Sequence, residues 1–183
     1  METQHYKLVP AQSEIAWIGR KVTGAHNGTI NILEGSLEFT NGALTGGEFI
    51  IDTRSISILD ITDPQTNAQF AGHLASEDFF SSAKYPTARL LILYAEKKPG
   101  DLYSITGNLT IKGITHTVNF EAGIGRNEET LEASGKMLVN RTLYDMKFRS
   151  GNFFQNLGDT LIYNDFDLHI KFTAKAANIA VPA

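Results

Sequence analysis

Short segments of alternating apolar and polar residues, separated by turn residues, make up most of this chain. In the longest, Leu102–Gly113, Ile105, Leu109 and Ile111 share one side, and the residues between them are mostly polar. Successive side chains of a strand point to opposite faces, so this pattern predicts strands with one buried face. The chain holds eight or more such segments, with turns roughly every 8–12 residues, which is typical of an antiparallel sandwich or barrel.

The expected strands begin at Ile15–Trp17 and end with the segment Thr160–Phe172. In the latter, Phe166, Leu168, Ile170 and Phe172 face one way, which indicates a wall with one apolar face. The segment Ala88–Tyr94 is apolar at nearly every position and predicts a strand that is covered on both faces.

Glycine pairs predict where the strands turn or bend. Asn27-Gly28 and Asn41-Gly42 are pairs that two-residue hairpin turns prefer, so we expect a turn at each. Gly46-Gly47 is expected to precede a further strand. Gly107 lies inside an alternating segment, which indicates a bend such as a barrel corner.

One stretch departs from the strand pattern and predicts the single helix of the chain, between the fourth and fifth strands. Pro64 suits a first helical position, and Asp63 before it can accept hydrogen bonds from the first turn. Phe70 and Leu74 are four residues apart and fall on one helix face. Two adjacent aromatic residues and a Tyr-Pro pair follow, and we expect this segment to cover the interior that the sheet encloses.

Composition limits the class of protein. A chain of 183 residues with 42% apolar content can bury one sizeable core, so residues 1–183 are expected to form one domain. The net charge of −4 provides no basic footprint for nucleic acid or an anionic membrane. The absence of cysteine excludes disulfides, thiolate metal sites and a cysteine nucleophile.

Hydropathy bears on the compartment. No apolar run approaches the roughly 20 residues that span a bilayer as a helix. The first residues lack the basic and apolar regions of a signal peptide. We therefore expect a cytoplasmic protein, or a periplasmic one if a signal peptide was removed.

Catalytic patterns are weak in this chain. The sequence contains five histidines, and no two have the short spacing of a local metal-ligand pair: His5, His26, His73, His116 and His169. The carboxylates around the expected helix are typical of capping and solubility features, and no Gly-x-Ser-x-Gly motif is present. We expect neither a metal site nor enzyme activity.

Several motifs, in order, resemble a known family. Gly72-His73-Leu74-x-Ser76-x-Asp78-Phe79-Phe80 followed by Tyr85-Pro86 is similar to the central signature of the YceI-like family of polyisoprenoid-binding proteins. The run from Gly107 to Thr115 matches its second signature. The resemblance extends over about Tyr6 to Ala174 and includes further matches at Ser13-x-Ile15-x-Trp17, His26-x-Gly28 and Asn140-Arg141.

This resemblance implies a fold and a function. The fold is an extended antiparallel lipocalin-like β-barrel of about eight strands, with the helix near one end. Family members bind long isoprenoids or related amphiphiles in a tunnel and often form homodimers. Three departures stand out. Thr142-Leu143-Tyr144-Asp145 follows Asn140-Arg141 where the family often has Ser-Asp-Phe-Gly, and the segment from Ser150 to Ile162 is longer and more aromatic than usual. Many members also carry a secretory signal, and this sequence shows none.

The leading hypothesis is a carrier of a polyprenyl, isoprenoid quinone or fatty-acyl ligand, without other cofactors. Asn140, Arg141 and His73 are candidates to orient a head group, although Arg141 could instead brace the barrel through a buried ion pair. Phe79 and Phe80 are expected to pack near the mouth, beneath the helix. The inward faces of the strands are expected to line the tunnel: Trp17, Leu37, Phe39, Phe49, Leu90, Ile105, Leu109, Ile111 and Phe120.

Two other hypotheses stay open. Aromatic residues could fill the interior completely, which would favour a ligand-free stress-response or interaction module. An enzyme acting on a lipid would need a convergent group of histidine and carboxylate side chains that the sequence does not display.

Overall fold

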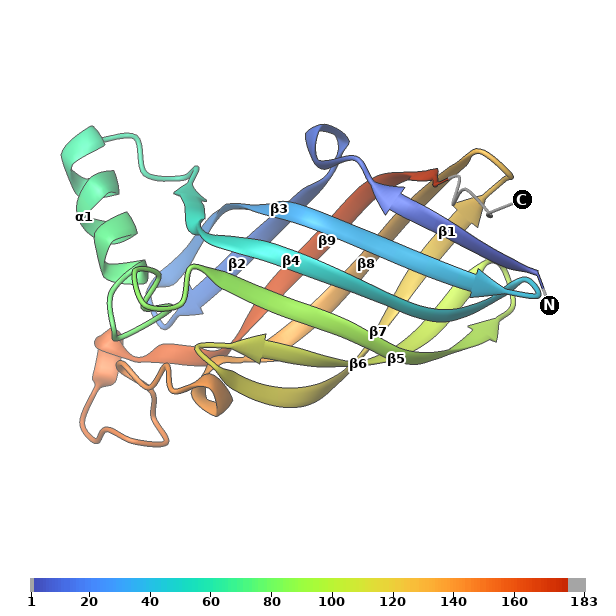
Figure 1. Ribbon diagram of the computed structural model, residues 1–183. Coiled ribbons are helices and arrows are strands. Elements are labelled where there is room, and N and C mark those ends of the chain that lie inside the picture. Colours follow the sequence, from blue (N-terminus) through green and yellow to red (C-terminus); the bar gives the residue numbers. More distant parts are fainter. Residues whose placement is uncertain (1, 178–183) are drawn as a thin grey trace.

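A closed antiparallel β-barrel forms the body of the protein (Figure 1). The computed structural model describes residues 2–177, which contain nine strands and one α-helix. In chain order these are β1 (Thr3–Leu8), β2 (Glu14–Lys21), β3 (Gly24–Thr40), β4 (Ala43–Ile58), α1 (Pro64–Leu74), β5 (Thr87–Lys98), β6 (Leu102–Ile111), β7 (Ile114–Arg126), β8 (Thr130–Asn140) and β9 (Ile162–Ala176). Short 3-10 helices cover Pro10–Gln12, Arg141–Tyr144 and Gly158–Thr160.

The nine strands make an eight-stranded barrel because β1 and β2 share one position. The order of pairing is β3-β2-β9-β8-β7-β6-β5-β4, and β4 pairs again with β3 to close the sheet. Both β1 and β2 pair antiparallel with β3 and β9, but with different parts of those two strands. The turn at Pro10–Gln12 lies between β1 and β2. The predicted antiparallel barrel of about eight strands, with one helix, is confirmed.

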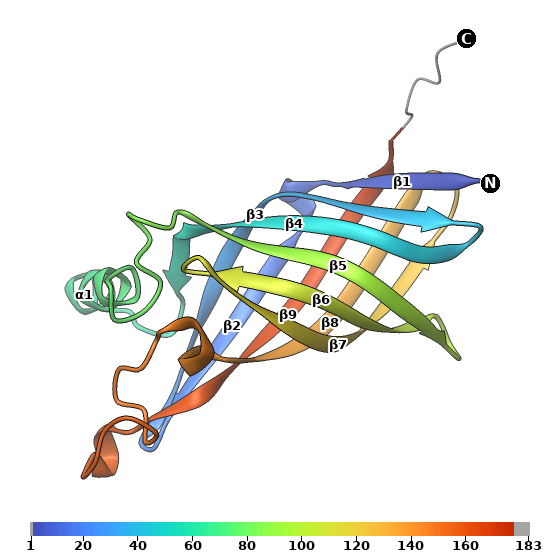
Figure 2. The same ribbon diagram turned by 60° about the horizontal axis from the view of Figure 1, so that its bottom comes forward.

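The barrel has two different ends (Figures 1 and 2). One, here called the helix end, carries α1, the β2–β3 turn and the segment 141–161 between β8 and β9. The other, the packed end, contains the β3–β4 turn and is filled by aromatic side chains. There Phe39 packs edge-on against Tyr6 and Tyr103, with ring centroids 5.7 and 6.4 Å away, and the Arg126 guanidinium lies 4.3 Å from the Phe39 ring centre.

The helix forms where the sequence predicts it. Asp63 precedes it, and its carboxylate accepts a hydrogen bond from the Thr66 N–H at 3.0 Å. Asn67 donates from Nδ2 to the Ile58 and Ile61 carbonyls at 2.9 and 3.0 Å. Leu74 is the one buried residue of the helix, so α1 lies on the barrel end rather than in the core.

Four local predictions were wrong. Gly46-Gly47 does not precede a strand but lies inside β4. The Asn27-Gly28 pair lies inside β3, and the hairpin turn falls at residues 22–23 instead. The first strand is Thr3–Leu8, which precedes Ile15. The segment Ala88–Tyr94 is covered on one face only, because Tyr94 is 63% exposed on the outside of the barrel.

Close approach of the Ser57 carbonyl and the Trp17 ring explains why glycine occupies position 28. A Cβ atom at Gly28 would lie 1.7 Å from the Ser57 carbonyl oxygen and 2.7 Å from the Trp17 ring. The strand therefore needs glycine here for space, not for a turn. Gly107 meets a similar limit, because a Cβ there would lie 2.7 Å from the Leu91 carbonyl oxygen, and the register between β5 and β6 shifts beside it.

We predict that Gly28→Ala lowers the free energy of unfolding by about 2 kcal/mol or more, because backbone atoms block the added methyl group. Urea denaturation followed by circular dichroism measures this. Gly125→Ala is the matched control, because Gly125 also lies in a strand and a methyl group added there would have no atom within 4 Å. Equal stability of the two variants would contradict the packing role.

Candidate functional site

A cavity of about 520 Å³ opens at the helix end and runs into the barrel. Strands β2 to β9 and α1 all contribute to its wall, which is mostly apolar. Along β8 it extends from Arg141, just after the strand, to Ala133; eight residues of strand correspond to roughly 26 Å. Such a long, narrow and apolar cavity suits a linear apolar molecule.

Arg141 brings a buried positive charge to this cavity. It is 3% exposed, and its guanidinium donates to the carbonyls of Met146, Tyr163 and Ile162 at 2.6, 3.0 and 3.0 Å. No carboxylate within residues 2–177 lies in ion-pair distance of it, so the alternative of a buried ion pair is wrong, and backbone carbonyls take that place. Burial lowers the pKa of Arg141 to about 10, and the side chain stays charged at neutral pH.

Two histidines line the helix end of the cavity, each paired with a carboxylate. His26 Nδ1 lies 2.7 Å from Asp60, and its ring packs against Phe70 of α1. His73 Nε2 lies 2.9 Å from the Asp78 carboxylate, and both residues belong to the motif that begins at Gly72. The first pair joins β3 to the loop before α1, and the second joins α1 to the loop after it.

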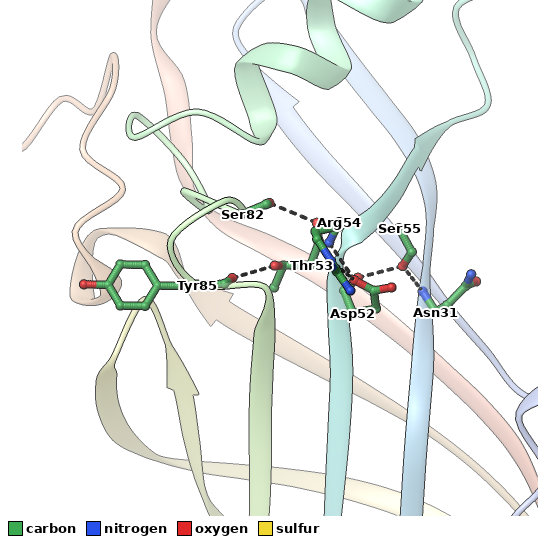
Figure 3. A network of polar contacts seen from close by, with 7 residues as sticks. All are labelled: Asn31, Asp52, Thr53, Arg54, Ser55, Ser82 and Tyr85. Carbon is green, nitrogen blue, oxygen red and sulfur yellow. Dashed lines mark hydrogen bonds and ion pairs between the residues drawn. The ribbon is translucent and has the colours of Figure 1, made fainter.

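A polar network attaches the cover segment, residues 75–86, to the barrel wall (Figure 3). Thr53 donates to the Tyr85 carbonyl at 2.7 Å, and Ser82 donates to the Thr53 carbonyl at 3.1 Å. Ser55 accepts from the Asn31 N–H at 2.8 Å where β4 loses register with β3. The network replaces ladder hydrogen bonds at this irregularity and holds Phe79 and Phe80 over the cavity.

Lys112 connects the second signature to two other segments of the helix end. Its ammonium group donates to the carbonyls of Glu77 and Asp145, at 2.9 Å each, and its side chain is 7% exposed. Beside it, Gly113 has φ +72° and lies against the Tyr85 ring. Asp145 has φ +60°, a conformation that Asp tolerates, at the position where the family often has glycine.

The structure places nearly all the predicted ligand-binding residues on the cavity wall. Phe39 lies in the packed end, outside the cavity, and Asn140 caps the following 3-10 turn by accepting from the Thr142 N–H at 3.1 Å. The predicted residues that line the cavity are Trp17, Leu37, Phe49, His73, Phe79, Phe80, Leu90, Ile105, Leu109, Ile111, Phe120 and Arg141. Their role in ligand binding stays a prediction.

Sequence reasoning missed other lining residues. Those on strands share the alternation of their neighbours, so the pattern could have identified them. The residues after β8 carry no such signal, because only the tertiary fold brings that segment back over the cavity. The missed residues include Ile15, Ile30, Phe70, Ala133, Met137, Phe148, Phe166 and Leu168.

Two buried polar groups have no hydrogen-bond partner among the described residues. Trp17 lines the cavity, and its Nε1 is a buried donor without an acceptor among the described residues. The Tyr144 hydroxyl is likewise buried with no partner in that part of the chain, and burial raises the pKa of its phenol to about 12, so it stays protonated. Across residues 2–177, no group of three His, Asp or Glu side chains is placed to hold a metal ion.

The length and hydropathy of the helices decide whether one of them could span a membrane. Within residues 2–177, no helix is both long and apolar enough to cross a membrane.

Comparison with known sequences identifies one family over most of the chain. A family model described as the YceI-like domain matches residues 6–174. The UPF0312 protein plu2095 of Photorhabdus laumondii is 31% identical over 157 residues, which cover 80% of this chain and 77% of that protein. Other curated relatives are matched over only 38% to 61% of their length.

Two solved structures share the fold. BcnA of Burkholderia cenocepacia has a TM-score of 0.71 at 18% sequence identity, over 91% of this chain and 98% of BcnA. A polyisoprenoid binding domain from Saccharophagus degradans has a TM-score of 0.67 at 12% identity, over 94% of this chain and 98% of that domain. At these identities the likeness establishes the barrel architecture.

We predict that Lys112→Met lowers the free energy of unfolding by about 2 kcal/mol, because two carbonyl groups at the helix end lose their donor. Chemical denaturation measures the loss. Lys97→Met, a matched change at an exposed position of β5, is expected to be nearly neutral. An equal effect at both positions would show that the carbonyl contacts contribute nothing.

Asp167 gives a pH-dependent prediction. The hydrogen bond from Arg20, at 2.8 to 3.0 Å, lowers the pKa of Asp167. A carboxyl with a lower pKa in the folded chain adds stability above its ordinary pKa of about 3.9, and this is lost as the pH falls through the folded value. Asp167→Asn should therefore be less stable than the wild type at pH 7, with the difference shrinking below about pH 4.

Urea denaturation at several pH values measures this difference. Asp159→Asn, in the exposed 3-10 turn before β9, is the control and should show no such pattern. A stability difference at Asp167 that is constant with pH would contradict the ion-pair account.

Proposed function

The chain belongs to the YceI-like family, and on this premise we propose that it binds one long-chain isoprenoid or a similar amphiphilic lipid inside the barrel and carries it. The observation that carries this proposal is the apolar cavity of about 520 Å³. Removing an apolar chain from water contributes on the order of 25 cal/mol per Å² before the costs of binding. The polyisoprenoid binding domain from Saccharophagus degradans shares the fold and supports the same ligand class.

The polar groups of the cavity suggest how the ligand is oriented. Arg141 offers a positive charge just beyond the end of β8, and Trp17 offers an N–H on the wall that has no acceptor among the described residues. A head group with oxygen acceptors would bind near these donors, with the apolar chain directed toward the packed end. His73 is the third candidate for head-group contact.

The alternatives are less well supported. An open interior argues against a solid-cored interaction module, whose barrel would be filled by side chains as the packed end is. The two histidines are each paired with one carboxylate, and no group of three His, Asp or Glu side chains among the described residues could hold a metal ion, so we propose binding without catalysis.

Native mass spectrometry of protein purified from its own host, followed by organic extraction, tests the proposal directly. We expect an isoprenoid or acyl species at about one copy per chain. A protein that is empty and takes up neither an added isoprenoid quinone nor a fatty acid would contradict it.

We predict that Ala133→Phe shortens the tunnel and weakens binding of a long isoprenoid quinone by about tenfold or more, because its ring occupies space deep in the cavity. Trp17 is the one tryptophan of the chain and lines the cavity, so quinone quenching of its fluorescence measures affinity. Ala43→Phe places the same ring at an exposed position and should bind as the wild type does.

A quinone analogue with a short side chain separates tunnel length from misfolding. Ala133→Phe should retain its affinity for the short analogue, since Arg141 and Trp17 are unchanged. Equal affinity of the wild type and Ala133→Phe for the long quinone would contradict a chain lying along β8.

We also propose that the protein is a cytoplasmic homodimer. The exposed Leu93 and Tyr94 on the outer face of β5 support a contact surface between copies. Sedimentation velocity and fractionation of host cells test the two statements separately.

A further inference from the structure

Two adjacent phenylalanines project from the helix end. Phe153 and Phe154 are 50% and 48% exposed, in the segment between β8 and β9. Their backbone N–H groups bond to the Ser150 carbonyl at 3.1 and 3.0 Å, and Ser150 itself is fully buried, with its hydroxyl donating to Asn164 at 2.6 Å. The rings are therefore displayed from an anchored turn rather than packed into the protein.

Cationic side chains accompany these rings. The Lys147 ammonium lies 4.8 Å from the Phe153 ring centre, and the Arg149 guanidinium lies 4.9 Å from that of Phe148. Lys147 also lies 3.6 Å from the exposed carboxylate of Asp145. Exposed aromatic rings beside lysine and arginine are the composition of segments that lie in the interface of a membrane.

The ring pair is continuous with the mouth of the cavity. Phe148 and Arg149 belong to the same segment, Ile162 begins β9 directly after it, and all three line the cavity wall. Val22, 47% exposed in the β2–β3 turn, donates its N–H to the Leu161 carbonyl at 3.1 Å and so extends the apolar surface. Figure 2 shows the β2–β3 turn and the segment between β8 and β9 at the same end of the barrel. We call Val22, Lys147, Arg149, Phe153 and Phe154 the mouth patch.

We propose that the mouth patch docks the barrel on the surface of a lipid bilayer, with the cavity mouth facing the lipid. Insertion of Phe153, Phe154 and Val22 removes apolar surface from water, while Lys147 and Arg149 meet the phosphates of the head groups. A protein partner would cover the same rings but would not need the cavity to open beside them. The whole-chain charge of −4 conceals this local arrangement.

This inference goes beyond ligand binding, and its test needs no ligand. Co-sedimentation with vesicles of 70% phosphatidylcholine and 30% phosphatidylglycerol measures the partition of the purified chain. We expect the double variant Phe153→Ser/Phe154→Ser to partition about tenfold less than the wild type. Lys147→Gln should reduce partition about fivefold on these vesicles and much less on pure phosphatidylcholine.

The matched control is Leu33→Ser/Leu138→Ser, which removes two exposed apolar side chains from the outer walls of β3 and β8, away from the mouth patch and from Leu93 and Tyr94. It should bind vesicles as the wild type does. Fluorescence quenching by isoprenoid quinone in the absence of vesicles reports the cavity separately, and the Phe153→Ser/Phe154→Ser variant should keep wild-type affinity there. A chain that does not bind quinone could therefore still sediment with vesicles. A chain that does not sediment with vesicles could still bind quinone.

Two results would overturn the proposal. One is a wild-type chain that does not sediment with either type of vesicle. The other is a mouth patch that is buried between two copies: the Phe153→Ser/Phe154→Ser variant would then change the sedimentation coefficient from dimer to monomer without changing vesicle partition.

Discussion

Closure of the sheet by the pairing of β3 with β4 is the constraint on which the rest of the structure depends. It removes the free edges that an open sheet of this length would expose. It also creates an interior that side chains must either fill or line. Glycine at positions 28 and 35 lets the Trp17 and Phe49 rings lie close along the inner wall, so the interior is lined over most of its length and filled only at the packed end.

At the helix end, buried cations take the place of hydrophobic packing. Lys112 and Arg141 each donate to backbone carbonyls of segments that are far apart in the chain, and these contacts fix the loops around the mouth. The two residues belong to different motifs, and the Lys112 contact with the Asp145 carbonyl connects one motif to the segment that follows the other. A single charged side chain can satisfy several carbonyls without filling the cavity, whereas apolar packing would close it.

The sequence predicted what depends on local periodicity and on single residues. The helix from Pro64 to Leu74, its cap Asp63, and the apolar face of β6 all follow from short-range rules. The turn predicted at Asn27-Gly28 was wrong because Gly28 leaves space for the Ser57 carbonyl and the Trp17 ring on the neighbouring strands. The turn preferences of residue pairs contain no information on such contacts. The prediction that Ala88–Tyr94 is covered on both faces was wrong because Leu93 and Tyr94 are apolar but exposed. Whether the aromatic residues fill or line the interior depends on strand tilt and register, which composition does not encode.

The division of the barrel into two ends bears on how a ligand enters. The packed end holds Tyr6, Phe39 and Tyr103 in mutual contact, and opening it would expose a large part of the core. α1 buries only Leu74 fully, packs Phe70 and Ala71 partly against the core, and is held to the barrel by the Asn67 hydrogen bonds to the Ile58 and Ile61 carbonyls. Regions with few buried apolar contacts open at the lowest free-energy cost. Exchange of a ligand should therefore proceed at the helix end, beside the exposed rings of Phe153 and Phe154, where movement of α1 leaves the barrel itself intact.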